Sequence, residues 1–74
     1  MNALVEKRIG ENIRKLRTKA KLTQEMLSAR LQVEGCDITR SALAKIEVGQ
    51  RHIYIDEIQL LKKLLGIRYE DLLD

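Results

Sequence analysis

Three glycines divide most of this 74-residue chain into short segments, and each directly follows a segment with the apolar spacing of a helix. Apolar residues before Gly35, Gly49 and Gly66 recur every three or four positions, which is typical of a helix with one buried face. Glycine just past a helix readily adopts the left-handed conformation that ends it. Proline is absent, and residues with good helix propensity dominate the composition. The pattern therefore predicts an all-α fold of short helices, without a strand.

Five helices are expected, at residues 3–20, 24 to 33 or 34, 40–48, 57–65 and 69–73. Polar residues stand where each of the first four would begin, and their side chains can cap free backbone N–H groups: Asn2, Thr23, Thr39 and Asp56. The buried stripe of the first helix is expected to hold Leu4, Val5, Ile9, Ile13, Leu16 and Ala20. Ile53 and Ile55 are expected to enter the core from the loop after residue 48. Short connections force the helices to cross, so residues 1–74 should form one compact domain.

The charge distribution is uneven along the chain. Residues 7–51 hold eleven lysines and arginines against five acids, whereas residues 52–74 hold three against five. The basic part suggests a polyanionic partner, with the acidic end facing away or contacting protein. Solvated helix faces are the alternative explanation of such a pattern.

Cysteine usage and hydropathy exclude several classes of protein. Cys36 is the one cysteine, so an internal disulfide cannot form, which fits a reducing cytosol. The one histidine, His52, is the only candidate base for a Cys36 nucleophile, and nothing else supports that pair. We therefore expect no enzymatic activity, no metal and no cofactor. No apolar run approaches the roughly 18 residues of a membrane span, so the protein should be cytoplasmic and have no membrane partner.

The segment 40–48 has the pattern of a helix that can enter the major groove of DNA. At about 100° per residue, Leu43 and Ile46 face the core. The outer arc then holds the candidate base-contacting residues Arg40, Ser41, Ala44 and Lys45. Small residues let the backbone approach the bases, and arginine or lysine can reach guanine O6 and N7. An ordinary solvated helix face is the alternative for this arc.

A family resemblance covers residues 9–73. The stretches IGENIRKLRTKAKLTQEMLSARL, ITRSALAKIEVGQR and IDEIQLLKKLLGIRYEDLL follow one another in the order and at the spacing of the Cro/phage-repressor class of helix-turn-helix proteins, the XRE family. The resemblance implies a compact five-helix repressor-like DNA-binding domain, with the helix-turn-helix formed by the second and third helices. It also implies a sequence-specific double-stranded DNA-binding transcriptional regulator, acting as a repressor, that contacts the major groove with residues 40–48.

The resemblance also implies roles for individual residues. An arginine late in the first helix, here Arg17, pairs with Glu47 to hold the recognition helix, and it can also present itself to phosphate. Thr39, Glu47 and Gly49 support that helix. Gln24 binds a backbone phosphate, and the loop residues Gln50, Arg51 and His52 lie against the phosphate backbone, with Arg51 the leading candidate. Lys19 flanks the same backbone. For His52 and Lys19 simple solvent exposure is an equal alternative.

Two features depart from the family pattern. The connection between Leu31 and Ile38 is five residues longer than usual, which leaves the angle of the third helix in the groove open. Lengthening a connector costs little free energy, so the fold should accommodate it. Leucines beyond those that the core needs suggest a homodimer contact, unless they complete a core that lacks phenylalanine: Leu60, Leu64, Leu72 and Leu73.

The expected partner is double-stranded DNA, and a homodimer would match a palindromic operator. A protein partner is the alternative, because the same fold can serve as a protein-interaction module or an antitoxin. Fold alone does not decide between these functions.

Overall fold

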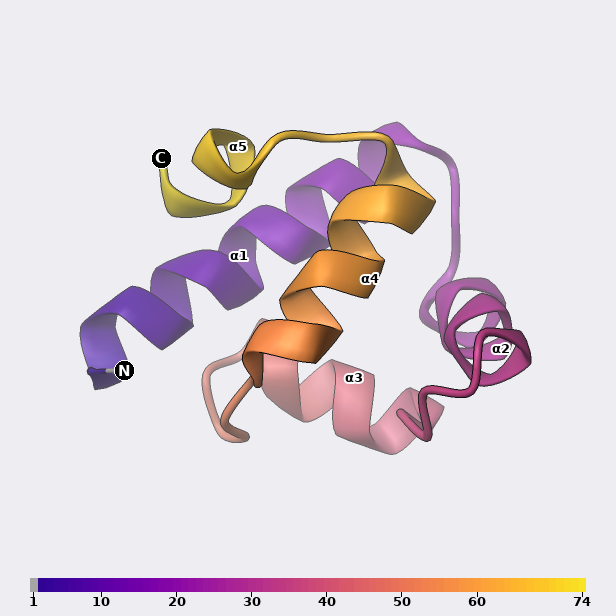
Figure 1. Ribbon diagram of the computed structural model, residues 1–74. Coiled ribbons are helices and arrows are strands. Elements are labelled where there is room, and N and C mark those ends of the chain that lie inside the picture. The colour runs from indigo at the N-terminus through magenta and orange to yellow at the C-terminus, as the bar shows by residue number, and fades with distance from the viewer. Residues whose placement is uncertain (1) are drawn as a thin grey trace.

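A computed structural model describes residues 2–74 as five helices with no strand among them (Figure 1). They are α1 (Ala3–Lys19), α2 (Gln24–Val33), α3 (Arg40–Glu47), α4 (Ile55–Leu65) and α5 (Tyr69–Leu73). The predicted all-α class and the predicted number of helices are confirmed. α1 is the longest helix and packs against both α3 and α5, whereas α2 packs against α3 and α4.

Aliphatic side chains fill the core. Every helix contributes to it, because each of the predicted helical stripes contains leucine or isoleucine at the buried positions. The most deeply buried side chains are Ile9, Ile13, Leu27, Leu31, Ile38, Leu43, Ile46, Leu61 and Leu72. The two ends of the predicted stripe on α1 lie outside this core: Leu4 is 80% exposed, and Ala20 is exposed at the helix end. The apolar spacing continues past the point where α1 has neighbours to pack against.

Three of the four predicted helix caps are confirmed. Asn2 Oδ1 accepts a hydrogen bond from Val5 N, Thr23 Oγ1 from Met26 N, and Thr39 Oγ1 from Ala42 N. Each bond satisfies a backbone donor that has no partner within its helix.

The start of α4 differs from the prediction. The Glu57 carboxylate accepts from Tyr54 N at 2.9 Å, so the helix begins at Ile55 and Asp56 lies in its first turn instead of capping it. The earlier start turns Ile55 outward, where it is 69% exposed, and the prediction of a buried Ile55 is wrong. Ile53 is buried as predicted, at 4% exposure.

The long connection between α2 and α3 is absorbed without loosening α2. Gly35 is left-handed (φ 84°), and Cys36 N donates to Leu31 O at 2.9 Å, which closes the end of the helix. Ser28 Oγ then donates to Ile38 O at 2.7 Å, and this buried bond ties the far end of the connection back to α2. Ile38 is fully buried between the two helices. The added residues therefore form an ordered turn.

Leu72 belongs to the core, which corrects the prediction that it contributes to a dimer contact. Its side chain is 1% exposed, and its carbonyl oxygen accepts a hydrogen bond from Asn12 Nδ2 at 2.7 Å. Both contacts fasten α5 to α1. Leu60 and Leu64 are half-buried against the core, and Leu73 is 50% exposed.

α1 and α3 approach each other closely at Gly10. A Cβ atom at this position would lie 2.1 Å from Ile46 O and 3.1 Å from the Cα of Glu47. These are backbone atoms of α3, so no side-chain rotation can make room. The missing side chain of Gly10 therefore sets how near the end of α3 lies to α1.

Gly10→Ala is expected to destabilise the protein. Alanine improves helix propensity by about 1 kcal/mol, but the displacement of α3 costs about 1–3 kcal/mol as in other overpacked cores, and the clash here is with backbone. We expect a lower thermal midpoint, measured by circular dichroism. Lys15→Ala, at an exposed site of the same helix, should change the midpoint little. An unchanged or raised midpoint in Gly10→Ala would contradict this packing.

Candidate nucleic-acid interface

The side chains on the outer face of α3 make no hydrogen bond or salt bridge within the described residues. Leu43 and Ile46 are buried, as their spacing predicts. Arg40, Ser41 and Lys45 are exposed, and Ala44 is half-buried. The structure therefore gathers the four predicted base-contacting residues on one side of a single helix, although their contact with DNA stays a prediction.

A buried carboxylate holds the far end of α3. Glu47 is 3% exposed and accepts three hydrogen bonds: from Arg17 Nε at 2.8 Å, from Arg17 Nη2 at 3.0 Å, and from Gln24 Nε2 at 3.1 Å. The predicted pairing of Arg17 with Glu47 is confirmed. Because the donors come from α1 and α2, this one carboxylate joins three helices. A buried charge is tolerated only when it is paired and hydrogen-bonded in this way.

This arrangement changes the role expected of Arg17. The third nitrogen of its guanidinium, Nη1, donates to Leu22 O at 2.8 Å, and the side chain is 11% exposed. Each of its three nitrogens thus donates one hydrogen bond inside the protein, which gives Arg17 a role in positioning α3. Arg17 also lines the hollow at the N-terminus of α2, and its phosphate contact stays a prediction. Gln24 is half-buried at the N-terminus of α2 and bonded to Glu47. Its predicted phosphate contact stays a prediction.

The loop between α3 and α4 is fastened by two acids from elsewhere in the chain. Arg51 donates to both carboxylate oxygens of Glu57 at 3.0 Å and to His52 O at 2.8 Å. His52 Nδ1 lies 2.8 Å from Glu6 Oε1, and Ile53 N donates to Glu6 Oε2 at 3.0 Å. These bonds fix the path of the loop after Gly49, which is left-handed at φ 76° and ends α3 as predicted.

The predictions for the loop are only partly supported. The Arg51 guanidinium is already bound to Glu57 and lies in a hollow with Asp37 and Asp56, so its surroundings are acidic. The structure therefore gives Arg51 a structural role in this loop, and its phosphate contact stays a prediction. The side chain of His52 is 80% exposed and pairs with Glu6. Cys36 is half-buried and lines the same hollow as Arg51. Gln50 is exposed, and its backbone N–H donates to Lys45 O at 2.8 Å.

Lys19 does not join the other predicted phosphate-binding residues. It lines a hollow with Leu65, Ile67 and Asp71, which places it on the side of α1 that faces α5. The prediction that it flanks the same backbone as the N-terminus of α2 is therefore not supported by its position.

The described residues contain no group of three histidine, cysteine or acidic side chains that could hold a metal ion. None of the helices in this part of the chain combines the length and the apolar character that crossing a membrane requires.

Comparison with known proteins agrees with this arrangement of helices. The family model described as helix-turn-helix, which is of the XRE type, matches residues 13–72. The chain belongs to this helix-turn-helix family. Members of the family are DNA-binding transcriptional regulators, and this helix-turn-helix protein is one of them.

A protein of known role and a solved structure are similar to this helix-turn-helix protein. The control protein C.BamHI of Bacillus amyloliquefaciens is 35% identical over 66 residues, which cover 88% of this chain and 75% of that protein. The crystal structure of the DNA-binding domain of BldD superposes with a TM-score of 0.82 over 100% of both chains, at 20% identity. The second similarity establishes the fold.

Two buried carboxylates that fasten this helix-turn-helix protein have shifted pKa values. The pKa of Glu6 lies below its ordinary value of 4.5, because His52 and then Ile53 N hydrogen-bond to the charged form. For Glu57, burial alone would raise the pKa, but the bonds from Arg51 and Tyr54 N outweigh it and the pKa is lowered. Neither residue was predicted to have a role. The partners of Glu6 lie 46 and 47 residues further along the chain, so the sequence pattern carries no signal for them. Glu57 accepts from Tyr54 N only three residues away, and an acid in the first turn of a helix is the local signal for such a bond.

Acid should destabilise this helix-turn-helix protein through these groups. Both folded pKa values lie below the ordinary 4.5, so the unfolded chain binds more protons as the pH falls below about 5. Stability is therefore fully present above that pH and is lost as the pH falls through the lowered pKa values. Urea denaturation from about pH 7 to pH 3 measures this.

Glu6→Gln should flatten this acid dependence, since one of the titrating groups is removed. Glu25→Gln, an exposed acid in the first turn of α2, is the control and should leave the curve nearly unchanged. If Glu6→Gln has the same acid dependence as the parent protein, the role given to Glu6 is wrong.

Proposed function

We propose that this protein is a sequence-specific transcriptional regulator that inserts α3 into the major groove of double-stranded DNA. The supporting observation is the contrast between the two sides of α3. Its inner side is buried and its end is anchored by Glu47, whereas Arg40, Ser41 and Lys45 are exposed. A rigidly held helix with free cationic and small side chains suits direct contact with base edges.

The neighbouring surface supports phosphate contacts on one side of α3. Arg40 and the N-terminus of α2 line a common hollow that includes Thr23 and Gln24. A helix N-terminus attracts anions through its free N–H groups and its dipole, so a phosphate there would fix the position of the duplex. The exposed Gln50 is the corresponding candidate in the loop after α3.

We further propose that the protein acts as a homodimer on a palindromic operator in the cytoplasm, as a repressor. Two recognition helices about 34 Å apart would match one turn of DNA. After the reassignment of Leu72 to the core, the partly exposed leucines that support a dimer contact are Leu60, Leu64 and Leu73. The similarity to a control protein supports a regulatory role.

One observation favours protein binding as a second candidate function. A shallow hollow between α2 and α4 has a mainly apolar surface from Ala29, Val33 and Leu64, and it is bordered by the charged residues Arg30 and Glu34. Val33 at its edge is 87% exposed. Such a surface suits a protein partner, as expected of an interaction module or an antitoxin.

Selection of binding sites from random duplex DNA tests the main proposal. The parent protein should enrich a defined consensus. Arg40→Ala should lose about 1–3 kcal/mol of affinity for that consensus and relax specificity at one base pair. Arg30→Ala removes an exposed cation in α2 that lines the α2–α4 hollow, and it should keep the consensus. Sequence-specific DNA binding is excluded if the parent protein enriches no sequence even at low salt.

A further inference from the structure

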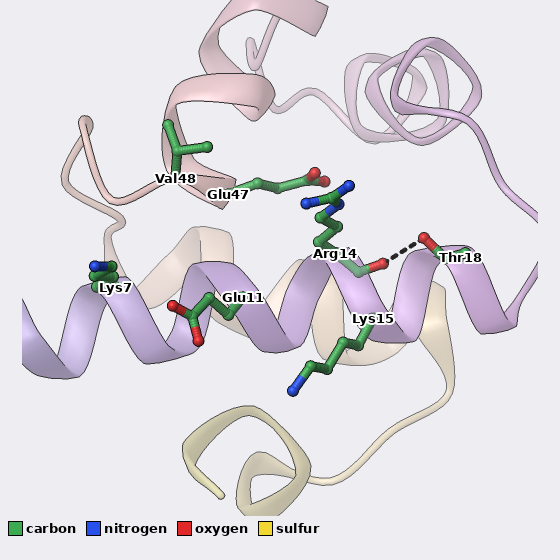
Figure 2. Close-up of a pocket in the computed structure, with 7 residues that line it drawn as sticks. All are labelled: Lys7, Glu11, Arg14, Lys15, Thr18, Glu47 and Val48. Atoms are coloured by element: carbon green, nitrogen blue, oxygen red, sulfur yellow. Dashed lines mark hydrogen bonds between the residues drawn. The ribbon is translucent and has the colours of Figure 1, made fainter.

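A groove runs along α1 beside the end of α3 (Figure 2). Its α1 side is lined by Lys7, Glu11, Arg14, Lys15 and Thr18, and its α3 side by Glu47 and Val48. Thr18 also lines the hollow at the N-terminus of α2 that holds Arg40. The groove and that hollow therefore meet at Thr18, with the groove beside the last residue of α3 and the hollow beside its first residue, Arg40.

Three cations line the groove, and two of them, Lys7 and Arg14, lie on one face of α1. Lys7 and Arg14 are seven residues apart on one face of α1, which is a rise of about 10.5 Å. A strand that follows α1 carries a phosphate on every nucleotide, so the two cations can meet two different phosphates of that strand. The stem of Lys7 also lies against the end of α3, because a Cβ atom at Gly49 would be 3.2 Å from Lys7 Cβ.

Neither cation is used inside the described part of the protein. The salt bridges among residues 2–74 involve neither Lys7 nor Arg14. Figure 2 shows Arg14 extending from α1 toward Glu47, but that carboxylate already accepts three hydrogen bonds from Arg17 and Gln24. Arg14 is thus directed into the groove beside an acid that other side chains neutralise.

We propose that this groove binds the sugar–phosphate strand that borders the major groove occupied by α3, with Lys7 and Arg14 contacting its phosphates. The inference rests on the proposed insertion of α3 into DNA. A strand in this position passes the N-terminus of α2, follows α1 and leaves beside Val48, whose side chain is 56% exposed and can contact deoxyribose. Neither Lys7 nor Arg14 belongs to the contacts expected from the sequence.

Glu11 offers a second test, in which a substitution should strengthen DNA binding instead of weakening it. It lies on the same face of α1, between Lys7 and Arg14, and no salt bridge among the described residues neutralises it. A phosphate in the groove is repelled by this carboxylate. Glu11→Gln should therefore tighten DNA binding, most clearly at low salt.

The decisive measurement is the salt dependence of binding to a selected operator, by fluorescence anisotropy. Each lost phosphate contact lowers the slope of log K against log salt by about 0.9, which is a factor of about 3.5 between 50 and 200 mM. Arg14→Gln should bind more weakly than the parent protein at 50 mM salt. The difference in affinity should shrink by about that factor per bound subunit as the salt concentration rises to 200 mM. Arg14→Lys keeps the charge and should keep the slope, and the operator consensus should stay unchanged in both.

Arg8→Gln is the matched control, since Arg8 is an exposed arginine of α1 that does not line the groove. The groove proposal is wrong if the parent protein binds its operator and Arg14→Gln has the same slope as Arg8→Gln. It is also wrong if Glu11→Gln fails to tighten binding. Failure of the proposed function looks different, because the parent protein itself would then select no operator.

Discussion

The position of α3 depends on the backbone contact between Gly10 of α1 and the last turn of α3. The carbonyl of Ile46 occupies the space that a side chain at residue 10 would need. This contact brings Glu47 to Arg17, and the hydrogen bonds of the pair then fix the helix against rotation. The close approach also forms one wall of the α1–α3 groove, so the same constraint shapes both surfaces proposed to contact DNA.

Acidic and basic side chains have separate roles in this protein. The buried acids Glu6, Glu47 and Glu57 each accept hydrogen bonds from another helix or from the loop after α3. Arg17 and Arg51, which bind two of these acids, stabilise the fold. The unpaired cations of α3 and of the groove along α1 remain available to an anionic partner. A net charge of +3 does not show this division, because Glu47 and Glu57 cancel their paired arginines in the sum.

Local sequence patterns predicted most of the fold, but they did not predict the polar contacts between residues that are distant in the sequence. The caps at Asn2, Thr23 and Thr39 and the glycine stops depend on neighbouring residues, so the sequence predicted them correctly. The Arg17–Glu47 pair was predicted through the family resemblance. The partners of Arg51 and the bond from Asn12 to Leu72 join residues that only the fold brings together. Arg51 was assigned to phosphate from the position of its loop in the family, and its bond to Glu57 was not predicted.

A double-mutant cycle on Arg17 and Glu47 tests most directly whether anchoring of α3 governs DNA binding. The affinities of the parent protein, Arg17→Met, Glu47→Gln and the double variant for a selected operator are compared where all four are folded by circular dichroism. We expect each single variant to weaken binding and the pair to show a coupling energy of about 1–3 kcal/mol, since they share one set of hydrogen bonds. Additive effects, or single variants that bind as tightly as the parent protein, would contradict the account.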